Sequence, residues 1–264
     1  MESYFPGDRY TTPADARTAF LHRLLGGWRW AFYIEYFTVV LAARKLAVRG
    51  RYDDQAWAES SRWIMRIAEK HGGRFEISGL QNLRRSASGG PFVFIGNHMS
   101  TLETQVLPVL IAPFLPVTFV VKESLVTGRM FGPVMRSRDP IVVKRRSPRE
   151  DLAEVLREGG VRLKRGVSLI VFPQSTRSPV FHPESFNTLG VKLAADAGVP
   201  AFPFAVKTDF WGERGLFRGF GPIRPERTIH IEFGQPVRVS GKGRDQHQGI
   251  VRFIESRLRL WQTG

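Results

Sequence analysis

The stretch GNHMSTLET at residues 96–104 combines a turn with two side chains that can carry chemistry. An apolar run at 91–95 precedes it, and a second apolar run follows it. This order predicts a buried strand, a tight turn and the start of a helix. His98 falls in the turn and Glu103 at the helix start. Because α/β proteins commonly place functional groups where strands end, we expect a site here.

Two interpretations of this pair remain open from the residues alone. A carboxylate on one nitrogen of a histidine can orient the ring, which then acts as a general base. On one continuous helix, positions five apart differ by about 140°, so His98 must precede the helix if it is to meet Glu103. The alternative is structural. Ser100-x-x-Glu103 has the form of a capping box, in which Glu103 only satisfies backbone amides.

Composition bounds the function further. The chain has 264 residues, 42% of them hydrophobic, which is enough for one large domain or one domain with a helical extension. It has no cysteine, which excludes disulfides, thiolate nucleophiles and cysteine-based zinc sites. A net charge of +15 favours a polyanionic partner, which can be nucleic acid, an anionic membrane surface, an acidic protein or a phosphorylated substrate. With six Trp and 20 Phe, the composition suits a membrane interface at least as well as nucleic acid. No nucleic-acid-binding signature is present, so we expect no nucleic-acid partner.

The segment at 17–48 is very apolar and predicts a helix, interrupted by Arg29 and Glu35. A membrane-spanning helix needs about 20 nearly uncharged residues, so this stretch is too short to span. We expect instead a helix that lies in the membrane interface or a helical hairpin with the next segment, and a helix that only covers the core is the alternative. Its dense aromatic residues favour contact with the membrane. These aromatic residues are Trp28, Trp30, Phe32, Tyr33, Tyr36 and Phe37.

The rest of the chain alternates short apolar strands with helices. We expect strands at 74–80, 91–95, 117–121, 140–143, 167–172, 201–206 and 228–233. We expect helices at 53–71, 128–135, 150–164, 189–197 and 250–261, one beginning at 105, and a polar loop at 84–90. This order predicts an α/β fold with a mixed, mostly parallel sheet flanked by helices. We divide the chain into an N-terminal helical, membrane-associating segment at 1–72 and an α/β domain at 73–264.

Two more stretches place polar side chains after a predicted strand. LIVFPQSTRSP at 169–179 ends in a turn that can offer hydroxyls, amides and a guanidinium to a phosphate, although an ordinary polar turn is the alternative. VVKRRSPRED at 142–151 places three cations after a strand, with a solvated basic face as the alternative. The candidate side chains are Gln174, Ser175, Thr176, Arg177, Lys144, Arg145 and Arg146.

The order of these stretches resembles the glycerolipid acyltransferase superfamily, and the lysophosphatidate acyltransferases in particular. The first family motif, Asn-His-x-Ser-x-x-Asp, is similar to 97–103, with Glu replacing Asp. The second ends in an apolar pair, a variable residue and Arg, and is similar to 142–145. The third, Phe-Pro-Glu-Gly-Thr-Arg-Ser, is similar to 172–178, and the fourth to 199–203. Lys122 begins a segment similar to the family's Lys-x-x-Leu.

The resemblance covers residues 74–233 and implies an O-acyltransferase. Such an enzyme moves a fatty acyl group from acyl-CoA or acyl carrier protein to the hydroxyl of a lysolipid, with lysophosphatidate as the first candidate. The resemblance implies that His98 takes the hydroxyl proton, that Glu103 orients His98, and that no acyl-enzyme forms. It implies neither a metal nor a redox cofactor.

The resemblance also implies how substrate and membrane are bound. Arg145 and Arg177 would hold the acceptor's phosphate, and turn amides near Ser175 would stabilise the oxyanion. The other expected substrate-binding residues are Lys122, Gln174 and Thr176. We expect the protein on the cytoplasmic face of a membrane, which is the inner membrane in a bacterium, bound to anionic lipid.

Departures from the family motifs leave the acceptor open. Glu103 replaces an aspartate, Gln174 removes a charge, Ser175 replaces a glycine, and the family's lysine is missing at 186–190. A late acyltransferase of lipid A or ornithine-lipid type is therefore an alternative. A catalytically weakened member that binds anionic lipid is an alternative of another class. A serine hydrolase is disfavoured, because the sequence has no Gly-x-Ser-x-Gly elbow.

Overall fold

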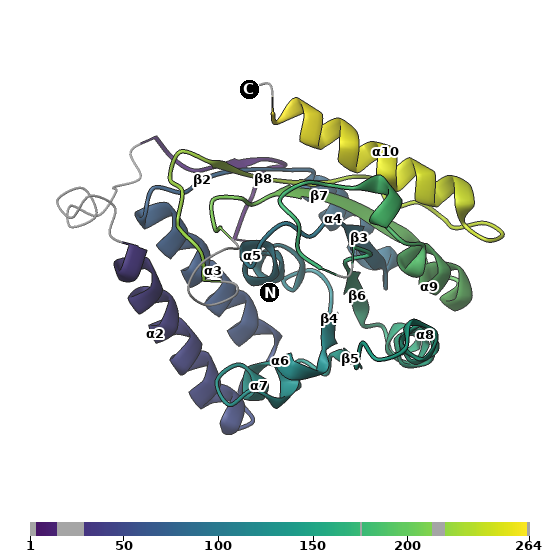
Figure 1. Cartoon of the computed structure of the whole chain (residues 1–264), viewed down its shortest axis with the longest axis horizontal. Coiled ribbons are helices and arrows are strands. Elements are labelled where there is room, and N and C mark those ends of the chain that lie inside the picture. The colour runs from purple at the N-terminus through teal and green to yellow at the C-terminus, as the bar shows by residue number, and fades with distance from the viewer. Residues whose placement is uncertain (1–3, 15–28, 175, 213–219, 263–264) are drawn as a thin grey trace.

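The computed structural model describes residues 4–14, 29–174, 176–212 and 220–262. Its strands are β1 (Tyr10–Thr11), β2 (Arg74–Ser78), β3 (Val93–Gly96), β4 (Val117–Lys122), β5 (Ile141–Val143), β6 (Ser168–Val171), β7 (Ala201–Lys207) and β8 (Thr228–Phe233). They form one sheet in the order β1-β2-β8-β7-β3-β6-β4-β5 (Figure 1). The neighbours from β7 to β5 run parallel, whereas β7–β8 and β1–β2 are antiparallel. The predicted mixed, mostly parallel sheet is confirmed.

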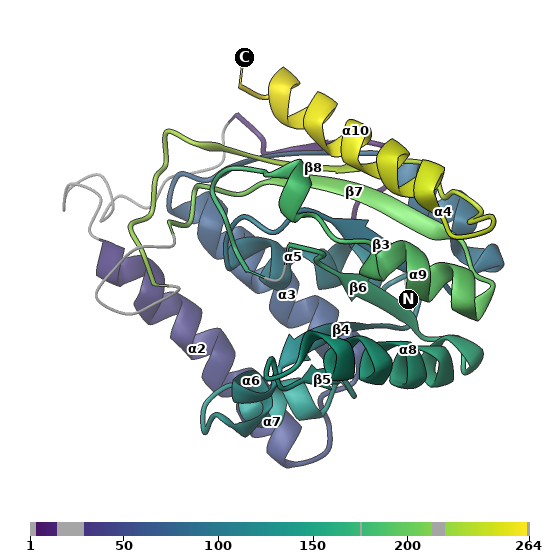
Figure 2. The same ribbon diagram turned by 45° about the vertical axis from the view of Figure 1, so that its right-hand side comes forward.

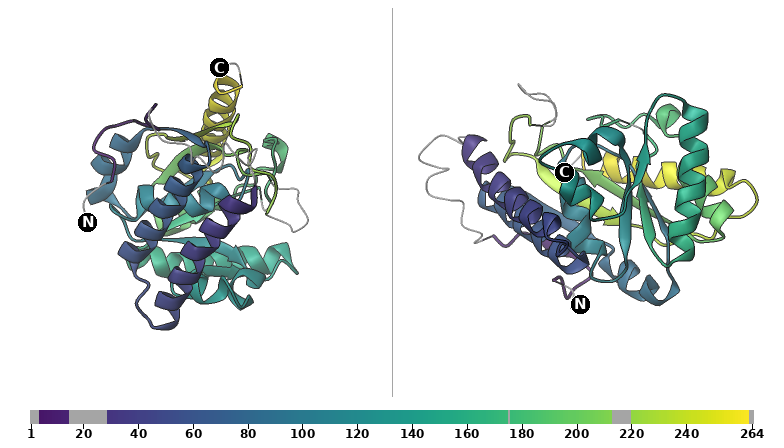
Figure 3. Two further views of the ribbon diagram at one scale, coloured as in Figure 1. Left: turned by 90° about the vertical axis from the view of Figure 1, so that its left-hand side faces the viewer. Right: turned by 90° about the horizontal axis from the view of Figure 1, so that it is seen from below.

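Helices cover both faces of this sheet. They are α2 (Arg29–Val48), α3 (Asp54–Lys70), α4 (Leu80–Ser86), α5 (Leu102–Ile111), α6 (Glu123–Thr127), α7 (Gly132–Arg136), α8 (Pro148–Lys164), α9 (Leu189–Ala197) and α10 (Arg244–Leu260). One layer consists of α5, α3 and, outside α3, α2, while α8, α9 and α10 form the other layer (Figures 1 and 2). The view from below in Figure 3 separates α2 and α8 on opposite sides of the strands.

The central strand β3 is apolar on both of its sides because both faces of the sheet are covered. Phe94 packs into the core on the α3 and α5 side. Val93 and Ile95 pack into the core on the α8, α9 and α10 side. The apolar run that precedes His98 in the sequence is therefore a fully buried parallel strand, and this strand delivers the histidine to the sheet edge.

The expected polar loop at 84–90 is wrong. The structure has α4 there, followed by a short 3₁₀ helix at Ala87–Gly89. Leu80 and Leu83 are buried on one side of α4, and this short apolar pair is enough to fold an otherwise polar segment against β8. The helix expected at 128–135 is also displaced, because α7 covers Gly132–Arg136 and the unanticipated α6 precedes it.

The aromatic residues of α2 point mainly into the protein. Phe32 and Tyr36 are buried, and their rings lie 5.0 and 5.1 Å from the ring of Trp211. Tyr33 is buried too, and its hydroxyl donates to the carbonyl of Gly221. These three residues therefore belong to the core, which corrects their assignment to a membrane interface. Trp28 lies outside the described residues, as does the expected helix at 17–28.

The opposite face of α2 is exposed and largely apolar. Its exposed apolar residues are Trp30, Ile34, Leu41 and Val48. Among the residues that the structure describes, no helix combines the length and hydropathy that crossing a bilayer requires. The division of the chain at 72/73 stays a prediction, and the helices α2 and α3 share one hydrophobic core with the sheet.

Candidate active site

The candidate site lies where β3, β4, β5, β6 and β7 end, because these parallel strands point their carboxyl ends to one edge. β3 ends at Gly96, which packs directly against the ring of Phe204. A Cβ at Gly96 would come within 2.3 Å of that ring, so only glycine fits this close approach. The chain then turns through 97–101 into α5. This is the strand, turn and helix start that the sequence predicts.

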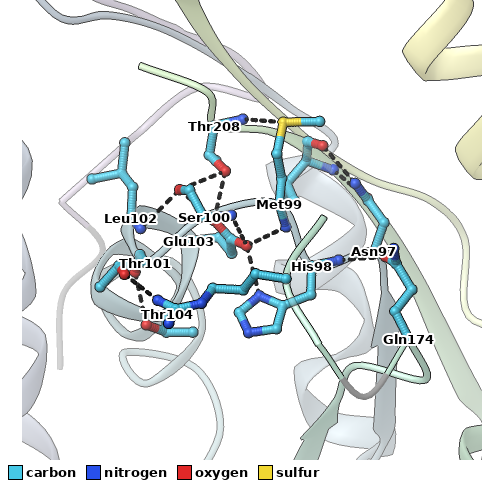
Figure 4. Close-up of polar contacts among 12 residues, drawn as sticks. Asn97, His98, Met99, Ser100, Thr101, Leu102, Glu103, Thr104, Gln174 and Thr208 are labelled. Atoms are coloured by element: carbon cyan, nitrogen blue, oxygen red, sulfur yellow. Dashed lines mark hydrogen bonds and ion pairs between the residues drawn. The ribbon is translucent and has the colours of Figure 1, made fainter. Parts of the chain in front are cut away.

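His98 and Glu103 meet at this edge (Figure 4). His98 lies in the turn and Glu103 lies in the first turn of α5, and the distance from His98 Nδ1 to Glu103 Oε1 is 2.7 Å. The Glu103 side chain is fully buried, whereas 17% of the His98 side chain is exposed. The pair therefore has the geometry of a histidine oriented by a carboxylate, with the outer part of the ring open to solvent.

Glu103 also accepts hydrogen bonds from the turn that precedes it. Oε1 accepts from the backbone N of Met99 at 2.7 Å and from that of Ser100 at 2.8 Å. Oε2 accepts from the Ser100 hydroxyl at 2.9 Å and from the Thr208 hydroxyl at 2.5 Å. Both interpretations of the sequence are thus realised at once. Glu103 satisfies backbone amides as in a capping box, and it contacts His98 as well.

The charge of Glu103 is stabilised despite its burial. Burial by itself raises the pKa of a carboxyl group, since it disfavours the ionised form. Here the hydrogen bond and charge of His98, followed by the Thr208 hydroxyl and backbone amides, outweigh that effect and hold the pKa of Glu103 below its usual value. The residue can therefore present a buried negative charge to the imidazole at neutral pH.

The third-motif turn holds the main chain of His98 from the other side. The backbone N of His98 donates to Gln174 Oε1 at 2.7 Å, and its carbonyl accepts from the backbone N of Ser178 at 2.9 Å. The ring of Phe172 stacks on the imidazole, with centroids 4.2 Å apart and 18° between the planes. Since Nδ1 faces the Glu103 carboxylate, Nε2 is the nitrogen available to accept a proton, and it has no hydrogen-bond partner among the described residues.

The residues of this turn that were predicted to bind substrate differ in burial and in their contacts. Gln174 is buried, and its side-chain oxygen is used by His98, so it acts on the site's own backbone. Arg177 lies beside the first motif and donates a hydrogen bond to the Thr101 hydroxyl. Thr176 is exposed. Ser175, and with it the predicted oxyanion amides, lies outside the described residues.

Lys122 and Arg145 share the edge but lie further from His98. Lys122 ends β4, two strands from β3, and Arg145 follows β5, three strands from β3. At about 4.8 Å per strand, the second separation is about 14 Å. Both side chains are exposed. Arg145 has a φ of 57°, a left-handed conformation that is uncommon for a residue with a side chain, and Asp151 Oδ2 accepts from its backbone N at 2.9 Å.

Sequence reasoning missed two residues that hold the site. Thr208 follows β7 and reaches Glu103 across 105 positions of the sequence. Asn97 lies in the first motif, and its side-chain amide makes two 2.8 Å hydrogen bonds to the backbone of Val206 in β7. The sequence could have identified Asn97, because it lies in the first motif beside His98. It could not have identified Thr208, because a single hydroxyl residue after a strand belongs to no motif.

Comparisons with known proteins point to one family. The family model described as acyltransferase matches residues 74–207. A 1-acyl-sn-glycerol-3-phosphate acyltransferase of Pseudomonas aeruginosa is 30% identical over 74% of this chain and 70% of its own length. A lyso-ornithine lipid O-acyltransferase of the same organism is 24% identical over 75% of this chain and 76% of its own.

A solved structure has the same fold. The crystal structure of the 1-acyl-sn-glycerophosphate acyltransferase PlsC from Thermotoga maritima superposes with a TM-score of 0.60 at 20% identity. The match covers 92% of this chain and 98% of that protein.

Proposed function

This chain belongs to the acyltransferase family, and from that premise we propose that it moves a fatty acyl group from a thioester donor to the hydroxyl of a lysolipid. The observation that carries the proposal is the contact between His98 and the buried Glu103 at the sheet edge. Lysophosphatidate is the acceptor we propose first, because the P. aeruginosa relative named for that acceptor is the more similar of the two compared.

In the proposed mechanism His98 is the general base. Its Nε2 accepts the proton of the acceptor hydroxyl, and the oxygen forms a bond to the thioester carbonyl carbon. The carbon–sulfur bond then breaks, and the thiolate leaves with the proton that His98 releases. The products are an ester and a free thiol. The ionised Glu103 fixes the tautomer of His98 and stabilises the imidazolium that forms during transfer.

Headgroup binding is proposed for the basic residues of the edge. Arg177 lies within contact of the first motif, and Lys122 and Arg145 extend a line of positive charge away from His98. An arginine can hold a phosphate with two parallel hydrogen bonds, which suits an acceptor whose reacting hydroxyl is carried on a phosphorylated glycerol.

A second acceptor has a specific observation in its favour. The lyso-ornithine lipid O-acyltransferase aligns over a slightly larger share of this chain than the first relative, although at lower identity. An ornithine headgroup carries no phosphate, so under this alternative the arginines bind a carboxylate instead.

A lysolipid panel tests the function. Purified protein is given lysophosphatidate, lyso-ornithine lipid or lysophosphatidylcholine, each with acyl-CoA or acyl carrier protein as donor, and the new ester is quantified by mass spectrometry. We expect lysophosphatidate to give the highest kcat/KM. A preference for lyso-ornithine lipid would move the assignment to the second acceptor. Absence of transfer with every pair would favour the lipid-binding alternative.

We also propose that the outer face of α2 rests on the membrane surface. On this face Ile34 is 60% exposed and Leu41 is 53% exposed. Arg44 and Lys45 follow them on the same helix and are exposed too. Apolar side chains flanked by cations suit a helix that lies in the interface of an anionic bilayer.

Substitution of the outer face separates docking from folding better than deletion of α2, because deletion also removes the buried Phe32 and Tyr36. We expect Ile34→Ser with Leu41→Ser to weaken binding to anionic vesicles severalfold. The matched control, Val161→Ser with Leu260→Ser, removes exposed apolar side chains from other helices and should leave binding unchanged. Equal binding by both double variants would contradict the proposed docking face.

A further inference from the structure

We propose that Thr208 is a positioning residue for the transfer reaction, acting through Glu103. It lies one position beyond the segment that the family model matches, so neither the motifs nor the comparisons assign it a role. The inference deepens the proposed function and rests on it, because it concerns the residue that holds the partner of the catalytic base.

The first argument is the division of donors between the two oxygens of Glu103. Oε1 carries the contact with His98 and two backbone amides. Oε2 faces away from the imidazole, and its strongest partner by distance is the Thr208 hydroxyl at 2.5 Å. Oε2 also accepts from the backbone N of Ser100 at 3.1 Å and from its hydroxyl at 2.9 Å, but both donors belong to the same loop as His98. The bond from Thr208 adds a donor held by another strand, which opposes rotation of the carboxylate about its last carbon–carbon bond and so helps to fix the direction in which Oε1 points.

The second argument concerns which hydroxyl carries which proton. Thr208 has one hydroxyl proton, and Oε2 of the carboxylate is an acceptor only, so this proton lies toward Glu103. The Ser100 hydroxyl lies 2.9 Å from both Glu103 Oε2 and Thr208 Oγ1, and it accepts from the backbone N of Leu102 at 3.0 Å. Ser100 can therefore donate to either oxygen, whereas Thr208 is committed to Glu103.

The third argument is the rigidity of Thr208 itself. The residue is fully buried, and its backbone N donates to Met99 Sδ at 3.3 Å. Two residues earlier, Val206 is tied to Asn97 by the pair of amide hydrogen bonds described above. The end of β7 is thus joined to both ends of the histidine loop, through Asn97 and through Glu103. Among the described residues, Thr208 is the only residue outside the loop whose side chain is bonded to Glu103.

Valine is nearly isosteric with threonine, so Thr208→Val removes the hydroxyl and keeps the volume. We expect kcat to fall about 10- to 100-fold, as for loss of a hydrogen bond to a charged group, with KM within about twofold of the parent value. Thr208→Ser keeps the hydroxyl and should restore kcat to within about threefold. A Thr208→Val variant with an undiminished kcat would overturn the proposal, as would a Thr208→Ser variant that is equally slow.

A matched control removes a buried threonine hydroxyl elsewhere. Thr118 in β4 is buried, and its hydroxyl donates to the carbonyl of Arg138 at 2.6 Å. Thr118→Val should lower Tm to a similar degree as Thr208→Val while leaving kcat unchanged. Equal losses of kcat in the two variants would mean that Thr208 contributes stability alone. If valine prevents folding at 208, Thr208→Ala against Thr208→Ser compares the same hydroxyl.

A double-mutant cycle asks whether Thr208 acts through Glu103. Under the proposal, Thr208→Val should slow Glu103→Gln little further, because the carboxylate it positions is already gone. Multiplicative losses would show that Thr208 acts on something else, and would overturn the assignment.

A measurement without substrate separates this inference from the proposed function. A proton shared between histidine Nδ1 and a carboxylate gives a far-downfield line in the ¹H NMR spectrum, which His98→Ala identifies by its loss. We expect the line in the parent and in Thr208→Ser, and its loss or broadening in Thr208→Val. If no acyl transfer is found with any acceptor but the line behaves in this way, the proposed function fails while the positioning role stands. An unchanged line in Thr208→Val overturns the positioning role.

Discussion

The loop at 97–103 and the basic turn at 144–147 lie at the same edge of the sheet, but the structure holds them differently. The loop is largely buried, and side chains or backbone from the ends of β6 and β7 are bonded to it. The turn is mostly exposed. Asp151 accepts from the backbone N of Lys144 and of Arg145, and this one carboxylate organises the turn from within its own segment.

The difference indicates a division of work. Proton transfer depends on distances of a few tenths of an ångström, so its groups must be fixed before the substrate arrives. Binding of a charged headgroup depends more on the amount of positive charge than on its exact direction, so exposed side chains suffice. We therefore expect changes in the loop to lower kcat, and changes in the turn to raise KM.

The largest effect is expected for His98→Ala. Loss of a general base typically costs 10²- to 10⁴-fold. Because no second base contacts Glu103 in the part of the chain that the structure describes, we expect kcat to fall about 1,000-fold. The protein should still fold, but Tm should fall because the buried Glu103 loses the partner that does most to stabilise its charge, whereas vesicle binding should not change. Steady-state kinetics with lysophosphatidate and acyl-CoA measures the first quantity. Turnover at the parent rate would remove His98 from the mechanism.

Glu103→Gln should have the next largest effect. An amide keeps one acceptor oxygen but turns an NH₂ group toward hydrogen-bond donors, and it cannot stabilise an imidazolium. We expect kcat to fall about 100-fold and the free energy of unfolding to fall by about 1–3 kcal/mol, the cost of leaving buried groups unpaired. A variant that is nearly harmless on both counts would mean that Glu103 only caps α5.

Arg145→Gln tests the other side of the comparison. We expect KM for lysophosphatidate to rise about fivefold at low salt, with kcat within about twofold, and the effect to shrink as ionic strength rises. Arg149→Gln is the matched control, since Arg149 is an exposed cation in the first turn of α8 and should leave KM unchanged. A fall in kcat without a change in KM would mean that Arg145 contributes to the transfer step, as the loop at 97–103 does, and not to headgroup binding.

The smallest effect is expected in the pH dependence of stability. The folded-state pKa of Glu103 is below its usual value, so the ionised form stabilises the fold at neutral pH. That contribution is complete above the unfolded pKa of about 4.3 and is lost as pH falls through the folded pKa. The Tm difference between the parent and Glu103→Gln should therefore shrink below about pH 4.3. A Tm difference that grows below this pH would show that the pKa of Glu103 is raised in the folded state and not lowered.

Much of this architecture follows from local patterns. The short apolar runs predicted β3, β6 and β7 because these central strands are buried on both sides. The range 189–197 matches α9 because Gly198 ends the helix in the left-handed conformation. The contact of His98 with Glu103 could be anticipated because both lie within one turn and one helix start. The prediction of a loop at 84–90 failed because the helix there is anchored by Leu80 and Leu83, which precede the segment and are too few to give a helical period.

Other features depend on segments far apart in the sequence. The apolar residues of helix α2 are not confined to one face, so its sequence could not tell which side is buried. Phe210 and Trp211, which lie after β7, decide that Phe32 faces inward and Ile34 faces outward. The aromatic residues that suggested a membrane surface are partly core for this reason.

By itself, the sequence determined the α/β order of elements, the His98–Glu103 pair, the Arg177 turn and the family resemblance. Each of these features depends on residues that are close together in the sequence. Only the tertiary structure decided which groups hold that pair in place. The pairing of β7 with β3 brings Thr208 to Glu103, and the pairing of β6 with β3 brings Gln174 to the backbone of His98. Strand pairing is a property of the whole packed sheet, and no local pattern specifies which hydroxyl or amide will arrive beside a given carboxylate.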